Sequence, residues 1–425
     1  MARQLRSLPP LVAALACTCA HAGAPPVAAD VLLSQGDALA GSTVATLNPV
    51  FLDGAGRPGS LVVLANGNRA IWYDGAVVFD SGDVAGTVLA GGEATIGIGD
   101  GGAFVYSPNA DGEDSVWTQA GLLLRGTDPA PGLPGQFTTF HSRPSMLPDG
   151  RAVWVGGLTD VQGGSTQGRV LYRASTTAPF AYEPLLRTGD VVGGFAIGTT
   201  GIGFQYQMSD SGAHLAALLI LQTGSTANDN VVYLDGSVVA REGSPVGSSA
   251  PGENWQNFAG VAVNDAGDWL LAGDTDGATA TDAFLAFNGE LQVREGDLVD
   301  GELLGAGSAL RAIAINNLGQ ALHAWNTPGN VRKLFFANDA GRLHDSVLLL
   351  RTGSGLDLTG DGNADATLVD ILGTFTTTTG LSLAEDGAIH IQASYDQGGN
   401  TRVSLLRLAL PDRLFYDGFQ AAAPF

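Results

Sequence analysis

A short phrase that recurs along the chain constrains its fold more than any other feature. In its clearest copy, at 294–297, the phrase reads Arg-Glu-Gly-Asp, and the other copies vary the positions around the glycine. The glycines of the copies are Gly36, Gly82, Gly126, Gly189, Gly243, Gly296 and Gly353. They lie 44 to 63 residues apart. A period of this length, filled with short apolar runs and Gly/Asp turns, is typical of a circular repeat fold.

Each repeat also carries signals for tight hairpins. One signal is Asn or Asp followed closely by Gly, as in 264–273 (NDAGDWLLAG) and 316–325 (NNLGQALHAW). The other is Asp-Gly or Asn-Gly between two alternating apolar runs, as in 71–83, 231–243 and 284–296. Because Asn, Asp and Gly accept the positive φ that tight hairpins require, each repeat is predicted to consist of strands joined by short turns.

The clearest repeat contains four predicted strands, at 258–264, 268–274, 282–288 and 290–295. Four antiparallel strands in each of seven repeats predict an all-β fold, a seven-bladed β-propeller of four-stranded blades. The abundance of glycine, 61 of 425 residues, suits a fold with this many turns. We expect the ring to occupy residues 31–410.

The two ends of the predicted ring complement each other. Residues 31–37 (VLLSQGD) have the pattern of a fourth strand with no blade before it, and residues 402–410 (RVSLLRLAL) have that of a third strand with no fourth strand after it. We therefore expect the N-terminal strand to complete the seventh blade and close the ring. Closure of this kind also removes an open sheet edge.

The first 22 residues have the features of a secretory signal peptide. Arg3 and Arg6 precede an apolar stretch, and small residues before Gly23 allow cleavage after Ala22. Residues 23–30 are then a short linker, and both cysteines, Cys17 and Cys19, are removed with the signal. The mature chain would have no disulfide, no thiolate metal site and no transmembrane segment. We expect an exported monomer, periplasmic or extracellular; a lipoprotein lipidated at Cys17 is the alternative.

The charge of the chain argues against one class of partner. The formal net charge is −22, and Lys333 is the only lysine. A chain this acidic, without a basic stripe, repels phosphate backbones, so nucleic acid is not expected as a partner.

One segment has a pattern typical of calcium loops, DLTGDGNAD at 357–365. Asp357, Asp361 and Asp365 have the spacing of side-chain ligands, and Asn363 can offer its backbone carbonyl. Thr359 stands where Asp or Asn is usual. The segment is therefore either a calcium site with one weakened ligand or a solvated Asp/Gly loop.

Loop lengths predict which face of the ring binds a ligand. The turns within the hairpins are short, whereas the loops joining the second strand to the third are longer, as are the crossovers between blades; examples are 109–115, 159–168, 223–230 and 273–282. Both long classes emerge on one face, which we call the long-loop face. His141 and Trp255 lie on its crossovers. Each could contact a sugar or a peptide, or pack within its own loop.

The markers together resemble a known family, the secreted bacterial proteins with tandem NxxGxxxAF repeats. The resemblance covers about residues 31–410 and is carried by 263–273, 315–325, 294–301 and 125–132. It implies secretion and a propeller-like fold, and no catalytic residue carries over. The last segment, 411–425, is a C-terminal tail that resembles the IFxDGFE ending of many secreted proteins of Gram-negative bacteria; it is either a strand packed on the ring or a sorting signal.

Two classes of function remain open. The favoured class is a non-catalytic binding or scaffold module that uses the long-loop face on a glycan, a peptide or a cell-envelope component. The alternative is a secreted hydrolase or lyase with carboxylates at the central channel, which would need two carboxyl groups with separated pKa values. The sequence has no nucleophile elbow, phosphate loop or zinc spacing that would favour catalysis.

Overall fold

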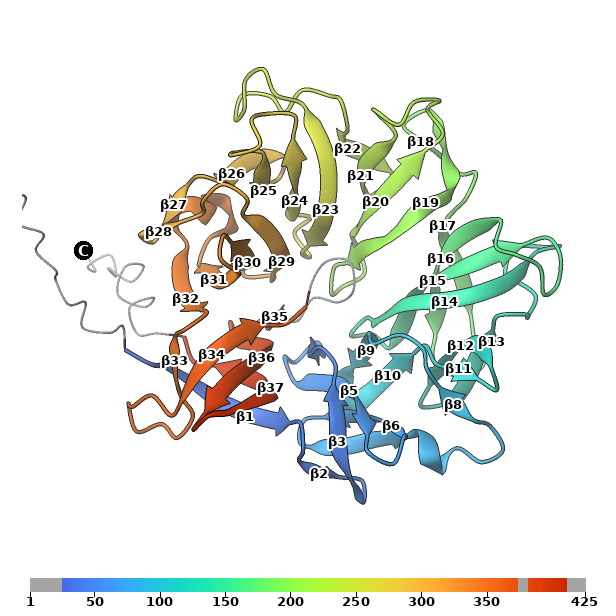
Figure 1. Ribbon diagram of the computed structural model, residues 1–425. Helices are drawn as coiled ribbons and strands as arrows, with labels where there is room; N and C mark the ends of the chain where they lie inside the picture. The colour runs from blue at the N-terminus through green and yellow to red at the C-terminus, as the bar shows by residue number, and fades with distance from the viewer. Residues whose placement is uncertain (1–24, 374–380, 411–425) are drawn as a thin grey trace, which may run out of the picture.

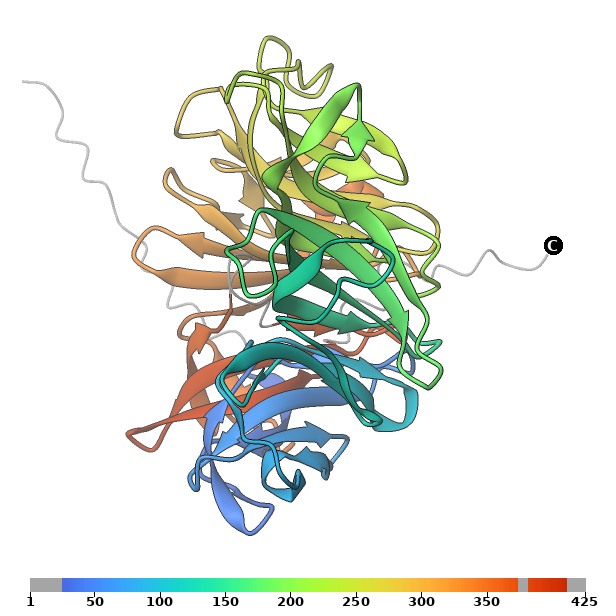
Figure 2. The same ribbon diagram turned by 90° about the vertical axis from the view of Figure 1, so that its right-hand side faces the viewer.

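The computed structural model describes residues 25–373 and 381–410, and the chain in these ranges is all-β with a β-propeller arrangement (Figure 1). The sheets surround a central axis, and their strands run between the two faces of the ring (Figure 2). The signal peptide, Cys17, Cys19 and the C-terminal tail lie outside the described residues. Within those ranges no helix is long and apolar enough to cross a membrane.

The first half of the ring contains four sheets. One holds β2 (Ala38–Leu39), β3 (Ser42–Leu47), β4 (Phe51–Leu52), β5 (Pro58–Leu64), β6 (Arg69–Tyr73) and β7 (Ala76–Asp80). The next holds β8 (Leu89–Ala90), β9 (Ile96–Gly99), β10 (Ala103–Tyr106), β11 (Asn109–Ala110), β12 (Glu113–Thr118) and β13 (Gly121–Arg125). A third holds β14 (Phe137–Met146), β15 (Arg151–Thr159), β16 (Gly168–Ser175) and β17 (Tyr182–Arg187). A fourth holds β18 (Val191–Val192), β19 (Phe195–Met208), β20 (Leu215–Leu221), β21 (Asn230–Leu234) and β22 (Ser237–Arg241).

The second half continues the same pattern. One sheet holds β23 (Trp255–Val263), β24 (Trp269–Thr275), β25 (Ala283–Phe287) and β26 (Glu290–Arg294), and a hairpin of β27 (Leu298–Val299) and β28 (Glu302–Leu303) follows. The next holds β29 (Ala309–Ile315), β30 (Ala321–Thr327), β31 (Val331–Ala337) and β32 (Val347–Arg351). The last holds β33 (Gly355–Asp357), β34 (Ala366–Ile371), β35 (Leu381–Leu383), β36 (Ile389–Gln397), β37 (Asn400–Leu408) and β1 (Val27–Ser34). The short 3-10 helices are Ser81–Asp83, Asp100–Gly102 and Ala340–Asp345.

The last sheet joins the two ends of the chain. Strand β1 pairs antiparallel with β37, with Leu33 opposite Leu405 (Figure 1). Beside this pair the hydroxyls of Ser34 and Ser404 lie 2.8 Å apart and share a hydrogen bond. The pairing predicted from the chain ends is therefore present. The strand begins at Val27, so residues 27–30 belong to the sheet and not to the linker that the sequence suggested.

The Arg-Glu-Gly-Asp repeat forms the turn that ends each sheet's outer strand. In one copy the Asp190 carboxylate accepts the Arg187 backbone N–H at 2.9 Å, and Gly189 between them has a φ of 90°. Glycine adopts this left-handed conformation without steric cost, which explains why it recurs. Equivalent bonds run to Asp37, Asp128 and Asp297. The repeat is thus a structural element at the start of each crossover.

The Asn-x-x-Gly repeat forms the turns that join each innermost strand to the next strand, which we call the inner turns. The Asn264 carbonyl oxygen accepts the N–H groups of Ala266 and Asp268, and closes its own turn. Its amide group donates to the Asn316 backbone carbonyl at 3.1 Å, and the Asn316 amide donates to the Ala384 carbonyl at 3.0 Å. One side chain therefore shapes its own turn and binds the neighbouring sheet.

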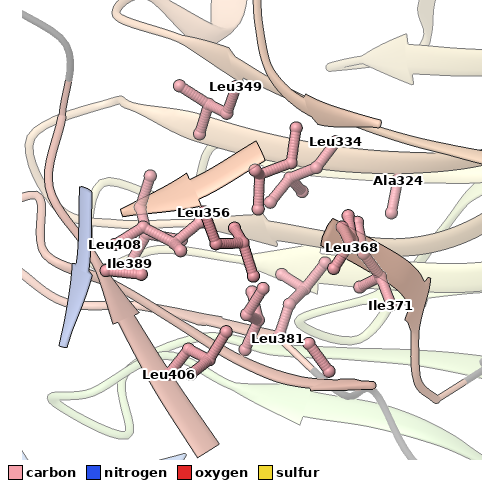
Figure 3. Close-up of a cluster of buried hydrophobic side chains, with 14 of the residues drawn as sticks. Ala324, Leu334, Leu349, Leu356, Leu368, Ile371, Leu381, Ile389, Leu406 and Leu408 are labelled. Carbon is pink, nitrogen blue, oxygen red and sulfur yellow. The ribbon is translucent and has the colours of Figure 1, made fainter. Parts of the chain in front are cut away.

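The hydrophobic core lies between neighbouring sheets. In the cluster of Figure 3, Leu334 and Leu349 contact a layer formed by Leu356, Leu368 and Leu406, and all five side chains are buried. Burying a leucine side chain stabilises a fold by roughly 1.5–3 kcal/mol. Similar clusters recur around the ring, so each sheet depends on its two neighbours.

We expect Leu33→Ala to destabilise the ring more than Val31→Ala in the same strand. Leu33 is 5% exposed, and its truncation leaves a cavity worth about 2–4 kcal/mol beside Leu405. Val31 is 40% exposed, and its truncation should cost less than about 1 kcal/mol. Denaturation followed by tryptophan fluorescence measures both values. Equal losses in the two variants would contradict the role given to β1.

Candidate functional site

Two cavities of about 320 Å³ each are candidates for ligand binding. The side cavity lies between the β8–β13 and β14–β17 sheets, and its lining includes Glu93, Asn109, Asp114, Phe140 and Arg169. The channel cavity lies on the ring axis and is lined by the innermost strands. Cavities of this size suit small ligands or the terminal group of a larger one.

The side cavity opens at the long-loop face. Asn109 in β11 and Asp114 in β12 flank a loop between the second and third strands of their sheet, and Arg169 stands at the start of β16 after the equivalent loop of the next sheet. Phe140 comes from the first half of β14, and Glu93 from the crossover before β9. The segment 109–115, predicted to contribute to the long-loop face, therefore supplies part of this cavity.

The lining of the side cavity includes both acidic groups and a cation. The Ser142 hydroxyl donates to the Glu93 carboxylate. Burial raises the pKa of Asp114, and the charge of Glu93 adds to the rise. The Arg169 guanidinium lies over the Phe140 ring, 5.8 Å from its centroid, and donates to the Ile202 carbonyl at 2.8 Å. The cavity therefore offers carboxylate acceptors and a guanidinium donor that is held in place.

His141 and Trp255 differ in their relation to this site. His141 lines the side cavity, but it is buried, and its Nδ1 accepts a hydrogen bond from Trp154 Nε1 at 3.1 Å. Burial lowers the pKa of His141 to about 4, which the Arg125 backbone carbonyl only partly offsets, so the ring is neutral at pH 7. Trp255 is buried against Phe284, with ring centroids 5.0 Å apart. Trp255 begins β23 and packs within its sheet, and His141 lies in β14, so neither residue is on a crossover loop as the sequence suggested.

The predicted calcium loop is closed by its own backbone. The Asp357 carboxylate accepts N–H groups of Thr359, Gly360 and Gly362, at 3.2, 2.7 and 2.9 Å. These bonds lower the pKa of Asp357, that from Gly362 most. Asp365 accepts from the N–H and the hydroxyl of Thr359, both at 3.0 Å.

The remaining predicted ligands do not join these carboxylates. Asp361 accepts only the Asn363 N–H, at 2.8 Å, among the bonds described for the loop. In the ranges that the structure describes, no three His, Cys, Asp or Glu side chains gather as they would around a metal ion. Calcium binding stays a prediction, and it requires Asp361 to turn toward Asp357 and Asp365.

Two variants separate the structural role of this loop from calcium binding. We expect Asp357→Ala to lower the melting temperature in EDTA and in calcium alike, because its backbone bonds need no metal. If the loop binds calcium, calcium raises the melting temperature of the wild type, and Asp361→Ala removes that increment. Thermal melts of the full chain test both statements. A wild-type melt that is the same in EDTA and calcium would contradict the calcium prediction.

The channel cavity contains two carboxyl groups that the sequence did not single out, Asp210 and Glu385. They occupy the same place in their inner turns, the second position of Ser-Asp-Ser-Gly and of Ala-Glu-Asp-Gly. The shared turn position of Asp210 and Glu385 is the one feature of the sequence that could have pointed to them. The sequence could not show that the turns of two separate sheets meet in one cavity.

Comparisons with known proteins do not identify a family. No family model matches the chain, and no curated protein matches it. Among solved structures, the β-propeller domain of the trilobed protease from Pyrococcus furiosus is 10% identical, covers 87% of this chain and 95% of that one, and has a TM-score of 0.47. A protein of unknown function from Bacteroides caccae is 13% identical, with 71% and 94% covered and a TM-score of 0.34. The WD40 propeller domain of Doa1 is 10% identical, with 75% and 94% covered and a TM-score of 0.35.

Proposed function

We propose that this chain is an exported, monomeric, seven-bladed propeller that acts as a non-catalytic binding module. Each sheet of four or more strands counts as one blade, and the β27–β28 hairpin belongs to a crossover. The signal-like N-terminus and the resemblance to secreted tandem-repeat proteins favour a location in the periplasm or outside the cell. The proposed binding surface is the long-loop face.

A glycan, a peptide or a cell-envelope component was expected there, and a glycan fits the side cavity best. Sugar hydroxyls both donate and accept hydrogen bonds, so they match a cavity that is lined by carboxylates and by an arginine. Glu93 and Asp114 offer acceptors, and Arg169 offers donors held in place by its bond to the Ile202 carbonyl. A peptide segment has fewer hydroxyl groups for these walls.

One observation carries the proposal. The side-chain oxygen of Asn109, a residue that lines the side cavity, is buried and has no hydrogen-bond partner among the described residues. A buried acceptor without a donor costs about 1–3 kcal/mol. A ligand hydroxyl donating to this oxygen would recover that free energy, which gives the cavity a reason to bind a hydroxylated molecule.

Screening the full chain on a glycan array, followed by calorimetry on the best ligand, tests this function. We expect Asn109→Ala and Arg169→Ala each to weaken binding at least tenfold, the loss expected for one hydrogen bond to a desolvated group. Arg151→Ala is the matched control, because Arg151 pairs with Asp149 at the inner-turn face. No glycan binding, or binding that Asn109→Ala and Arg169→Ala leave unchanged, would refute the proposal.

A hydrolase or lyase is the second candidate, and the channel carboxyls favour it. Asp210 and Glu385 hydrogen-bond each other, and burial raises the pKa of both. A pair of carboxyl groups that share a proton titrates in two steps, which supplies the separated pKa values that an acid/base pair requires. Incubating the bound glycan with the chain and analysing the products by mass spectrometry separates the two functions. Cleavage that Glu385→Gln abolishes would establish the enzyme, whereas intact ligand supports the binding module.

A further inference from the structure

The channel cavity is built by innermost strands from all around the ring. Phe51 and Leu52 enter it from β4, Val261 from β23, Ile313 from β29 and Leu381 from β35. These side chains give the cavity an apolar wall. In Figure 1, β23, β29 and β35 face the middle of the ring.

Strands β14 and β19 also line the cavity, and their pairing is irregular there. The register of β14 against β15 shifts between Ser142 and Ser145, and Arg143 within the shift has a φ of 53°. The register of β19 against β20 shifts before Tyr206. Bulges redirect side chains and are common beside functional sites, and a left-handed arginine is a strained conformation. Both bulges place polar side chains on the cavity wall.

The inner turns bring three carboxyl groups together at one end of the cavity. Asp265 accepts the N–H and the hydroxyl of Ser211, both at 2.7 Å, and the Asn317 amide at 3.1 Å. Burial opposes ionisation of Asp265, but the bonds from Ser211 leave its pKa below the usual value. Asp265 is therefore an ionised carboxylate with its own donors.

Asp210 and Glu385 hydrogen-bond each other. The Asn317 N–H donates to both Glu385 oxygens, at 3.1 and 2.9 Å. Burial raises the pKa of Glu385 to about 7, and the Asp210 charge adds to the rise although the Asn317 N–H opposes it. Asp210 is more exposed than Glu385, but partial desolvation by the surrounding turns raises its pKa as well. As the pH falls below about 7, Glu385 takes up a proton that the two hydrogen-bonded carboxyl groups share.

The same cavity contains a hydroxyl group without a hydrogen-bond partner among the described residues. Thr95 lines the cavity, is 4% exposed, and its hydroxyl has no hydrogen bond among the described residues. A buried hydroxyl of this kind is satisfied when a ligand or water occupies the adjoining space. The cavity therefore has unused hydrogen-bonding capacity that is independent of the carboxyl pair.

We propose that the channel cavity binds a small organic ammonium ion between Asp210 and Glu385, with its carbon body against Val261, Ile313 and Leu381. The cation replaces the shared proton, and both carboxylates become ionised around it. No covalent bond changes; one proton leaves to solvent for each ammonium bound.

An organic ammonium fits this pair better than a metal ion does. A divalent cation such as calcium needs six to eight oxygen ligands, and both Glu385 oxygens already accept an N–H. The described residues contain no cluster of three side chains able to hold a metal. An ammonium group needs only about three acceptors, and its alkyl body gains from the apolar wall.

Other charged and titratable groups surround the pair. They are Asp265 in the turn after β23, Arg143 in β14, Tyr206 in β19 and Asp386 beside Glu385, and His214 lies near Asp265. Burial raises the pKa of Tyr206 and lowers that of Arg143, for which the charge of Glu93 is the main opposing effect. Proton release is therefore assigned to the pair only where the Asp210→Asn and Glu385→Gln variants lose it.

The test is calorimetry of the full chain with n-butylammonium chloride between pH 6 and pH 8. Butylamine stays protonated in this range, as lysine does. With the pKa of Glu385 at about 7, we expect roughly tenfold weaker binding at pH 6 than at pH 7.5, and about 0.9 proton released per amine at pH 6. 1-Butanol, which has the same carbon body without charge, should not bind measurably.

Three variants assign the binding to the pair. Asp210→Asn and Glu385→Gln should each weaken butylammonium binding at least tenfold. Asp386→Asn is the matched control, because it removes one charge from the same turn while its side chain accepts only the Ala388 N–H among the described bonds. Glucosamine and glycinamide, titrated in the same way, distinguish an amino sugar from a peptide amino terminus as the source of the amine.

The stability of the variants gives an independent readout. A carboxyl group with a raised pKa favours the folded state most below its unfolded pKa, and this contribution is lost as the pH rises toward 7. Glu385→Gln should therefore fold and show a smaller loss of melting temperature between pH 5 and pH 8 than the wild type. Butylammonium binding that persists in Asp210→Asn and Glu385→Gln would overturn the proposal. Equal binding of 1-butanol, or no binding of any of the amines tested, would overturn it as well.

Discussion

The antiparallel pairing of β1 with β37 is the interaction on which the rest of the ring depends. It places β1 between β37 and β33 in the last sheet and holds the first and last described strands in one hydrogen-bonded ladder. Because every sheet buries its faces against its neighbours, a ring left open would expose apolar side chains on two sheets. Closure also fixes the inner turns around one axis, and both cavities rely on that fixed spacing.

The recurring positions of the two sequence repeats hold turns in shape and join neighbouring sheets. Asp190 and its equivalents hold the turn that ends an outer strand, and Asn264 and Asn316 join neighbouring inner turns. A repeated residue does the same structural work in each copy. The residues that differ between copies, such as Asp210 and Glu385 in the inner turns, are those that give the cavities their chemistry.

The sequence predicted the parts of this fold that depend on local chemistry. Asp-Gly and Asn-Gly turns have a conformational preference that holds wherever they occur, so the hairpins and the strand at the N-terminus could be placed. The bulge at Arg143 and the contact between Asp210 and Glu385 arise from packing across the ring, which no local pattern encodes. Trp255 lies on a predicted crossover, but its packing against Phe284 depends on a strand 29 residues later.

The order in which the chain is made adds a consequence of the β1–β37 pairing. Strand β1 cannot pair when it leaves the ribosome, because its partner β37, at residues 400–408, is synthesised more than 350 residues later. Until then β1 and the growing sheets carry unpaired edges that other chains can join. The final sheet can therefore form only once β37 is available, and a chain truncated before β37 would leave β1 exposed as a site for aggregation.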